Sequence, residues 1–129
     1  MDSKWGDLRM GKKILIVDDA MFFRKMVEDA LNKAGYADIY EAGTAIDAKK
    51  IFLEEDIDLV VLDITLPDCK DLCMCQEFFR LKKDANVIIY SAVTQELVKE
   101  QAKKIGVAGY FTKPMDVDEF IKLVDSILN

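Results

Sequence analysis

Polar residues that suit phosphoryl chemistry follow four short apolar runs of this chain, each at the point where a run stops. They carry carboxylate, hydroxyl and ammonium groups, which bind divalent cations and phosphoryl oxygens. In an open parallel sheet, ligands bind at the carboxyl ends of the strands, so we expect these side chains to form one site. The residues are Asp18 and Asp19 after run 14–17, Asp63 after run 59–62, Ser91 after run 87–90 and Lys113 after run 110–112.

Three carboxylates in so small a volume need a counter-charge, because like charges raise one another's pKa and burial adds to the penalty. Lys113 supplies one positive charge, which is too little, so we expect Mg²⁺ with oxygen ligands as the cofactor. Asp63 is then the expected nucleophile toward phosphorus, with Lys113 and Ser91 neutralising the transferred group. Taken singly, each of these residues also fits a helix cap, a strand end or a solvated position. Their recurrence at four strand ends favours a site.

The elements that must position these residues are five buried strands alternating with amphipathic helices, each helix crossing over between two parallel strands. Right-handed crossovers that cover both faces of the sheet require the strand order 2-1-3-4-5. The fold class is therefore α/β, a doubly wound five-stranded parallel sheet of the flavodoxin-like (βα)5 type, with its crevice between the first and third strands. The expected strands are 14–17, 39–41, 59–62, 87–90 and 110–112, with 39–41 at the edge.

Helix boundaries follow from polar N-caps and from glycines that end helices. We expect the first helix to end at Gly35 and later helices to begin at Thr44, Asp71, Thr94 and Asp116. The spacing of apolar residues gives the first helix one stripe that faces the sheet. This stripe consists of Phe22, Met26, Val27, Ala30 and Leu31.

Length and composition limit the protein class. The 129 residues fit one domain, with residues 1–11 as a flexible N-terminal extension that contains Trp5 and residues 12–129 as the folded domain. A net charge of −6 without any histidine excludes imidazole chemistry and offers no basic footprint for nucleic acid. The sequence shows neither a signal peptide nor an apolar run of about 20 residues, so we expect a cytoplasmic protein that does not span a membrane.

Three cysteines, Cys69, Cys73 and Cys75, lie close together in the sequence. Their odd number argues against a disulfide framework. A zinc site would need a fourth ligand, and the chain has no histidine to supply one. We therefore expect free thiols.

Four motifs give the chain a family resemblance: ILIVDDA, followed by Arg24, then VVLDITLP, IIYSA and GYFTKP. With these motifs, residues 13–129 resemble the receiver domain of two-component response regulators, in particular the single-domain chemotaxis type, called CheY-like. The strand order 2-1-3-4-5 is known for this family, so the order is not independent support. The resemblance also implies a cis peptide bond between Lys113 and Pro114.

The resemblance implies how the acidic residues act. Asp63 is the phosphoacceptor and takes the phosphoryl group from a phosphohistidine of a histidine kinase. Asp19 and Asp63 bind Mg²⁺ directly, together with the backbone carbonyl of Thr65. Asp18 acts on the metal through water.

The resemblance further implies that Lys113 and Ser91 contact the phosphoryl group, and that Ser91 forms a switch pair with Tyr110. The hydroxyl moves toward the phosphoryl group and the tyrosine ring turns inward behind it. This movement remodels the face made by the fourth helix, the fifth strand and the fifth helix, and so changes partner affinity. The protein is then a switch rather than an enzyme, with only intrinsic self-phosphorylation and autodephosphorylation.

Two positions depart from the family pattern. Asp71 stands where a glycine is usual, shortly after Pro67, which leaves the conformation of that loop open. Val93, two positions after Ser91, has no group to orient an attacking water. We therefore expect slow intrinsic dephosphorylation.

The expected partners are a histidine kinase, a downstream protein such as a flagellar motor switch protein, and a phosphatase. The chain itself is expected to be a monomer that binds neither nucleic acid nor membrane. A receiver domain from a larger regulator would show the same features. A phosphohydrolase with Asp63 as nucleophile is disfavoured, because it would need a second acid at the position of Thr65 and a cap domain. A docking module that keeps the fold without phosphorylation would not respond to beryllofluoride and Mg²⁺.

Overall fold

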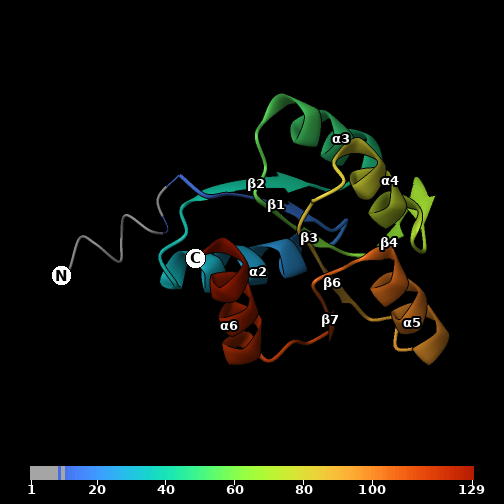
Figure 1. Cartoon of the computed structure of the whole chain (residues 1–129). Helices are drawn as coiled ribbons and strands as arrows, with labels where there is room; N and C mark the ends of the chain where they lie inside the picture. Colours follow the sequence, from blue (N-terminus) through green and yellow to red (C-terminus); the bar gives the residue numbers. More distant parts are fainter. Residues whose placement is uncertain (1–8, 10) are drawn as a thin grey trace.

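A five-stranded parallel sheet lies at the centre of the computed structural model, which describes residue 9 and residues 11–129 (Figure 1). Trp5 and most of the expected N-terminal extension lie outside these residues. The sheet has the order β2-β1-β3-β6-β7, and each neighbouring pair is parallel. Counted within this sheet, that is the predicted order 2-1-3-4-5, so the predicted fold class is confirmed. The strands are β1 (Lys13–Val17), β2 (Asp38–Ala42), β3 (Leu59–Leu62), β6 (Val87–Ser91) and β7 (Gly109–Thr112).

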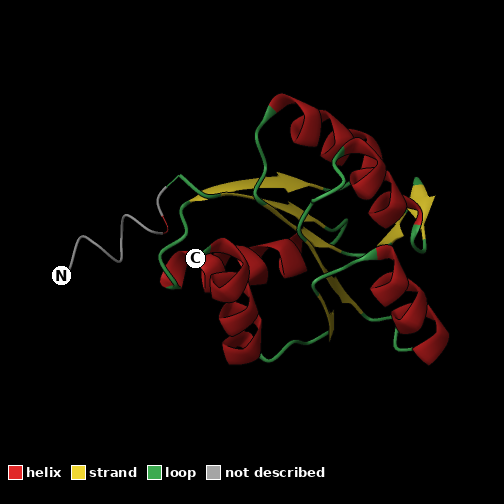
Figure 2. Cartoon of the chain, in the orientation of Figure 1, coloured by secondary structure: helices red, strands yellow, loops and turns green. Residues whose placement is uncertain are grey.

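Helices cover both faces of the sheet, as Figure 2 shows in red around the yellow strands. One layer contains α2 (Met21–Lys33) and α6 (Val117–Leu128). The other layer contains α3 (Ala45–Glu54), α4 (Cys73–Leu81) and α5 (Glu96–Ile105). Within the part of the chain that the structure describes, no helix is long and apolar enough to cross a membrane.

The core is divided by the sheet into two apolar layers. Side chains alternate between the faces of a strand, so Leu15 and Val17 of β1 pack with the layer of α3, α4 and α5. Ile14 and Ile16 of the same strand pack with the layer of α2 and α6. All four are at most 1% exposed. Burial on both faces explains why these strands appear in the sequence as continuous apolar runs.

Two of the four predicted N-caps are confirmed. The Thr44 hydroxyl accepts a hydrogen bond from the N–H of Asp47 at 3.2 Å, and the Asp116 carboxylate accepts one from the N–H of Glu119 at 3.1 Å. These bonds satisfy backbone donors that the first turn of a helix leaves unpaired.

The other two predicted N-caps, Asp71 and Thr94, are wrong. The N-cap of α4 is Leu72, because Asp71 has φ 56°, a left-handed conformation unlike the extended backbone of an N-cap. The N-cap of α5 is Gln95, whose carbonyl accepts the N–H of Lys99 at 3.2 Å and so begins the helical ladder.

The predicted apolar stripe of α2 is wrong at Phe22, which is 70% exposed. Phe23 packs against the core in its place. Phe23 lies four residues before the buried Val27, whereas Phe22 is turned away by one helical step, about 100°. An exposed phenylalanine therefore stands on the first turn of the helix.

A small hairpin that was not expected from the sequence follows β3. Its strands, β4 (Thr65–Leu66) and β5 (Cys69–Lys70), pair antiparallel, with Thr65 opposite Lys70. Strands of two residues are too short to produce a recognisable apolar period.

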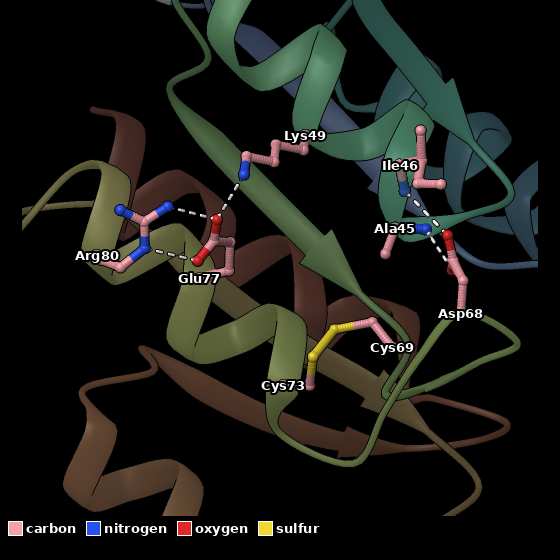
Figure 3. Close-up of a disulfide and its surroundings, with 8 residues drawn as sticks. All are labelled: Ala45, Ile46, Lys49, Asp68, Cys69, Cys73, Glu77 and Arg80. Atoms are coloured by element: carbon pink, nitrogen blue, oxygen red, sulfur yellow. Dashed lines mark hydrogen bonds and ion pairs between the residues drawn. A yellow bond between two sulfur atoms is a disulfide. The ribbon is translucent and has the colours of Figure 1, made fainter.

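A disulfide links this hairpin to α4, so the expectation of free thiols is wrong for Cys69 and Cys73 (Figure 3). Their Cα atoms lie 5.6 Å apart, within the usual range for a disulfide. The third cysteine, Cys75, is a free and buried thiol. An odd count excludes only a framework in which every cysteine is paired, and here one local pair forms beside a core cysteine.

Candidate functional site

The sheet brings the predicted site residues to one edge. Asp18 follows the end of β1, Asp63 the end of β3 and Lys113 the end of β7, while Ser91 is the last residue of β6. These four strands are neighbours and parallel, so their carboxyl ends meet. From β1 the chain adds β2 on one side and then β3 on the other, so the order of strand addition reverses between β1 and β3. An α/β sheet opens a crevice at this point.

Three carboxylates gather in this crevice. Asp18, Asp19 and Asp63 each offer one oxygen, and these oxygens all lie within 4.8 Å of one another. Asp18 and Asp63 are buried, each 3% exposed, whereas Asp19 is exposed and open to solvent. Hard oxygen donors with an open side suit Mg²⁺, which binds one or two carboxylates and keeps several waters. The donor set therefore fits the predicted metal.

Lys113 supplies a positive charge against two of these carboxylates. Its Nζ lies 2.6 Å from Oδ2 of Asp18 and 3.3 Å from Oδ2 of Asp63. The ammonium also lies 4.1 Å from the centroid of the Phe23 ring, a cation–π contact that helps to place it. The peptide bond between Lys113 and Pro114 is cis, as the family resemblance implies.

Asp18 is held from three sides. Burial raises the pKa of its carboxyl group above the usual range, and the negative charge of Asp63 adds to this. The hydrogen bonds from Lys113 and from the N–H of Ala20, the latter at 2.9 Å, act in the opposite direction. The backbone carbonyl of Asp18 accepts a hydrogen bond from Arg24, which also pairs with Glu41 at 3.0 Å.

Arg24 is therefore a positioning residue that sequence reasoning noted only as part of a motif. It ties the loop after β1 to β2 and so fixes the backbone that carries the acidic pair. Its position six residues after Asp18, on the first turns of the following helix, is the signal that points to this role.

Thr65 holds Asp63 in place. Its N–H donates to Oδ1 of Asp63 at 3.2 Å, and its hydroxyl donates to Oδ2 at 2.8 Å. From the sequence, Thr65 is expected to act only through its backbone carbonyl, so the contribution of its side chain is an addition from the structure. The Asp63 carboxylate thus receives hydrogen bonds from Thr65 and from the Lys113 ammonium.

Ser91 and Tyr110, the predicted switch pair, both contact Val93 in the loop between β6 and α5. The buried Ser91 hydroxyl accepts the N–H of Val93 at 3.3 Å, and the Tyr110 hydroxyl donates to the carbonyl of Val93 at 2.6 Å. Tyr110 is half-buried and packs against the core. Burial, with a smaller effect from the charge of Asp63, raises the pKa of its hydroxyl. One loop residue therefore joins the two.

Comparison with known proteins agrees with this geometry. Residues 14–125 match the response regulator receiver domain family. The chain is 32% identical to chemotaxis protein CheY of Thermotoga maritima over 118 residues, which cover 92% of this chain and 98% of that protein. It is 31% identical to sporulation initiation phosphotransferase F of Bacillus subtilis over 119 residues, 92% of this chain and 95% of that protein.

A solved structure shows the same likeness. The CheX–CheY–BeF3–Mg complex from Borrelia burgdorferi contains a chain with a TM-score of 0.81 and 27% identity, covering 92% of this chain and 90% of that one. Family, relatives and fold agree with the resemblance carried by the four motifs. The chain belongs to the response regulator receiver domain family, the phosphorylatable signalling switches of two-component systems.

Proposed function

We propose that this receiver domain, residues 12–129, accepts its phosphoryl group on Asp63. The observation that carries the proposal is the position of the Asp63 carboxylate, which lies within reach of one ammonium and two further carboxylates at the end of a central strand. In the transfer, an oxygen of Asp63 attacks phosphorus, the P–N bond of a kinase phosphohistidine breaks, and the imidazole leaves.

Asp19 and Asp63, with the backbone carbonyl of Thr65, are the residues that would hold Mg²⁺ directly, and Asp18 would act through water. Bound there, the metal neutralises charge on the phosphoryl oxygens. Lys113 already lies against Asp63 and orients the carboxylate, and its ammonium follows the charge onto the phosphoryl group. Thr65 fixes the rotation of the Asp63 side chain through its two hydrogen bonds.

Ser91 and Tyr110 convert this local charge into a signal. When the Ser91 hydroxyl turns toward the phosphoryl group, its hydrogen bond with Val93 is disturbed, and the Tyr110 hydroxyl holds the same residue. The face of α5, β7 and α6 then changes shape. Leu97 on α5 is a large apolar side chain that is 66% exposed and offers a contact to a partner.

The partners that fit this switch are a histidine kinase, a downstream protein of the flagellar motor switch kind and a phosphatase. The chain binds them as a monomer in the cytoplasm. No turnover of a substrate is part of the proposal. The chain's own chemistry is self-phosphorylation from small phosphodonors and autodephosphorylation.

The test is incubation with acetyl phosphate and Mg²⁺, followed by intact-protein mass spectrometry. We expect a single phosphoryl mass increase that Asp63→Asn abolishes and chelation of Mg²⁺ prevents. Asp56→Asn is the matched control, because Asp56 is exposed and precedes β3 rather than following it. Labelling that persists in Asp63→Asn would overturn the assignment.

A further inference from the structure

The disulfide between Cys69 and Cys73, drawn in Figure 3, lies in the segment that follows Asp63 in the sequence. Cys69 belongs to β5 and is half-buried, and Cys73 is the first residue of α4 and is exposed. Both line a surface hollow of about 270 Å³, together with Ala45 and Lys49 of α3. A thiol from solution can therefore reach the sulfur atom of Cys73.

We propose that Cys69 and Cys73 form a reversible thiol–disulfide exchange site, and that its redox state sets the Mg²⁺ affinity of the phosphoacceptor site. The partner is a dithiol reductant in one direction and a low-molecular-weight disulfide in the other. The exchange stands on the cysteine pair alone, while the effect on Mg²⁺ rests on the proposed function of Asp63 and Thr65.

The exchange follows ordinary steps in which atoms and electrons balance. A thiolate of the dithiol attacks Sγ of Cys73, whose residue is exposed, the S–S bond breaks, and Cys69 leaves as a thiolate that takes up a proton. The second thiol of the reductant then attacks the mixed disulfide and releases Cys73. The chain gains two electrons and two protons, and the dithiol becomes a cyclic disulfide. Oxidation by a small disulfide reverses these steps.

Charge at the hollow permits a thiolate at Cys73. The residue opens α4, a helix of nine residues whose N-terminus favours negative charge. Two carboxylates that line the same hollow are already paired. Asp68 accepts the N–H groups of Ala45 and Ile46 at 2.7 and 3.1 Å, and Glu77 is held by Lys49 at 2.8 Å.

Cys75 does not compete for either partner. It is fully buried on the core side of α4, and burial raises the pKa of its thiol to about 12. A thiol that stays protonated and out of reach takes no part in exchange. The reactive set is thus two cysteines out of three.

The disulfide is connected to Asp63 by a short path through the hairpin. Cys69 pairs with Leu66 across the hairpin, and the neighbouring Thr65 donates two hydrogen bonds to the Asp63 carboxylate. At its tip, Asp68 fastens the hairpin to the N-terminus of α3. The disulfide is the covalent connection between this hairpin and the first residue of α4.

Reduction removes that connection and leaves the hairpin held by its hydrogen bonds and by the buried side chain of Leu66. The position of Thr65, whose carbonyl is a proposed metal ligand, is then less fixed. Groups that hydrogen-bond a metal ligand typically contribute about 10–100-fold to metal affinity, and the disulfide supports Thr65 from one step further away. We expect the reduced chain to bind Mg²⁺ roughly tenfold more weakly than the oxidised chain.

The test uses the full chain in three samples: untreated, reduced with dithiothreitol, and reduced then treated with oxidised glutathione. Each sample is alkylated without denaturant, and the alkylated residues are counted by mass spectrometry. Mg²⁺ affinity is measured in parallel by NMR titration. We expect neither Cys69 nor Cys73 to be alkylated before reduction, and both to be alkylated after it. After treatment with oxidised glutathione, neither should be alkylated again. The Mg²⁺ affinity should change roughly tenfold in parallel.

Two variants sharpen the result. Cys73→Ser should bind Mg²⁺ like the reduced chain under all conditions, whereas Cys75→Ala should keep the full redox response. The exchange site would be overturned if the dithiol did not reduce the Cys69–Cys73 disulfide, or if oxidised glutathione did not form it again. Equal Mg²⁺ affinities of the oxidised and reduced chains would overturn the coupling. Absent labelling by acetyl phosphate in both redox states would instead count against Asp63 as phosphoacceptor and would leave the thiol counts intact.

Discussion

The ammonium of Lys113 lies 2.6 Å from a carboxylate oxygen of Asp18, although 95 residues separate them in the sequence. This ion pair joins the loop after the edge strand β7 to the loop after β1, across the ends of β6 and β3. Both side chains are nearly buried, with 9% and 4% of their surface exposed. The pair therefore connects the loops at the carboxyl ends of the strands, and both of its residues belong to the candidate site.

Replacing Lys113 by alanine is expected to lower the free energy of unfolding by about 3 kcal/mol, because two buried carboxylates, Asp18 and Asp63, would lose their cationic partner and keep only hydrogen bonds. Urea denaturation measures this loss. Lys122→Ala is the control: that ammonium is exposed and lies 3.9 Å from Glu119, so the expected change is within about 0.5 kcal/mol. Equal stabilities for the two variants would show that the buried pair is not stabilising.

The arrangement of the strands and of the acidic site could be predicted from the sequence because both follow from the parallel sheet. Runs buried on two faces are apolar throughout, and the residues that follow such runs meet at one edge. Asp18, Asp63 and Lys113 were placed together on this ground, and the structure brings them together. The helix caps at Thr44 and Asp116 were predictable for the same kind of local reason.

What the sequence did not predict depends on contacts that leave no periodic signal. The hairpin that carries Cys69 has only two residues in each strand, and whether a cysteine meets a partner is a matter of tertiary distance. Phe22 and Phe23 are both apolar, and a shift of one residue decides which of them faces the sheet. The bond from the Tyr110 hydroxyl to Val93 requires the fold of the β6–α5 loop.

The backbone conformation at position 71 predicts how stable the protein is with aspartate, alanine or glycine there. Its φ of 56° is left-handed, a conformation that costs an ordinary side chain about 1–2 kcal/mol and glycine nothing. We expect Asp71→Ala to lower the free energy of unfolding by about 1 kcal/mol, as measured by urea denaturation. Asp71→Gly should be at least as stable as the wild type. An alanine variant as stable as the glycine variant would contradict this reading of the loop.

Glu77 gives a pH dependence with a defined sign. The side chains of Arg80 and Lys49 lower the pKa of its carboxyl group from 4.5 to about 2 (Figure 3). Its contribution to stability is therefore present above pH 4.5 and lost as the pH falls toward 2. The difference in unfolding free energy between the wild type and Glu77→Gln should shrink across this range. High salt at pH 7 should also reduce it, because the group is exposed to screening.

A matched variant separates this effect from general acid unfolding. Glu119→Gln changes a glutamate whose pairing with Lys122 is long, at 3.9 Å. Its difference from the wild type, measured over the same pH range, is the baseline. A Glu77→Gln difference that does not shrink between pH 4.5 and 2 would show that the contacts of Arg80 and Lys49 do not lower the pKa of Glu77 in solution.

Val93 is expected to set the lifetime of the phosphorylated state. Its side chain has only methyl groups, so nothing at this position orients a water for attack on the phosphoryl group. Val93→Glu should shorten the lifetime roughly tenfold or more, which is less than the roughly 10²–10⁴-fold that a positioned acid or base typically contributes. Decay of the phosphorylated mass after removal of acetyl phosphate measures this. Val93→Ile, which adds no polar group, should decay like the wild type. Fast decay in the wild type, unchanged in Val93→Glu, would contradict the expectation.

Tyr110 has two separable contributions, from its ring and from its hydroxyl. Tyr110→Phe removes the 2.6 Å hydrogen bond to the Val93 carbonyl and keeps the ring against the core, so the expected loss is about 1 kcal/mol. Tyr110→Leu also removes ring packing and should cost about 1 kcal/mol more. Urea denaturation measures both losses. Labelling by acetyl phosphate should continue in both variants, because neither change touches Asp63. A Tyr110→Phe variant as stable as the wild type would show that the hydroxyl does not hold the loop in the unphosphorylated state, and the loop's movement would then have to depend on Ser91 alone.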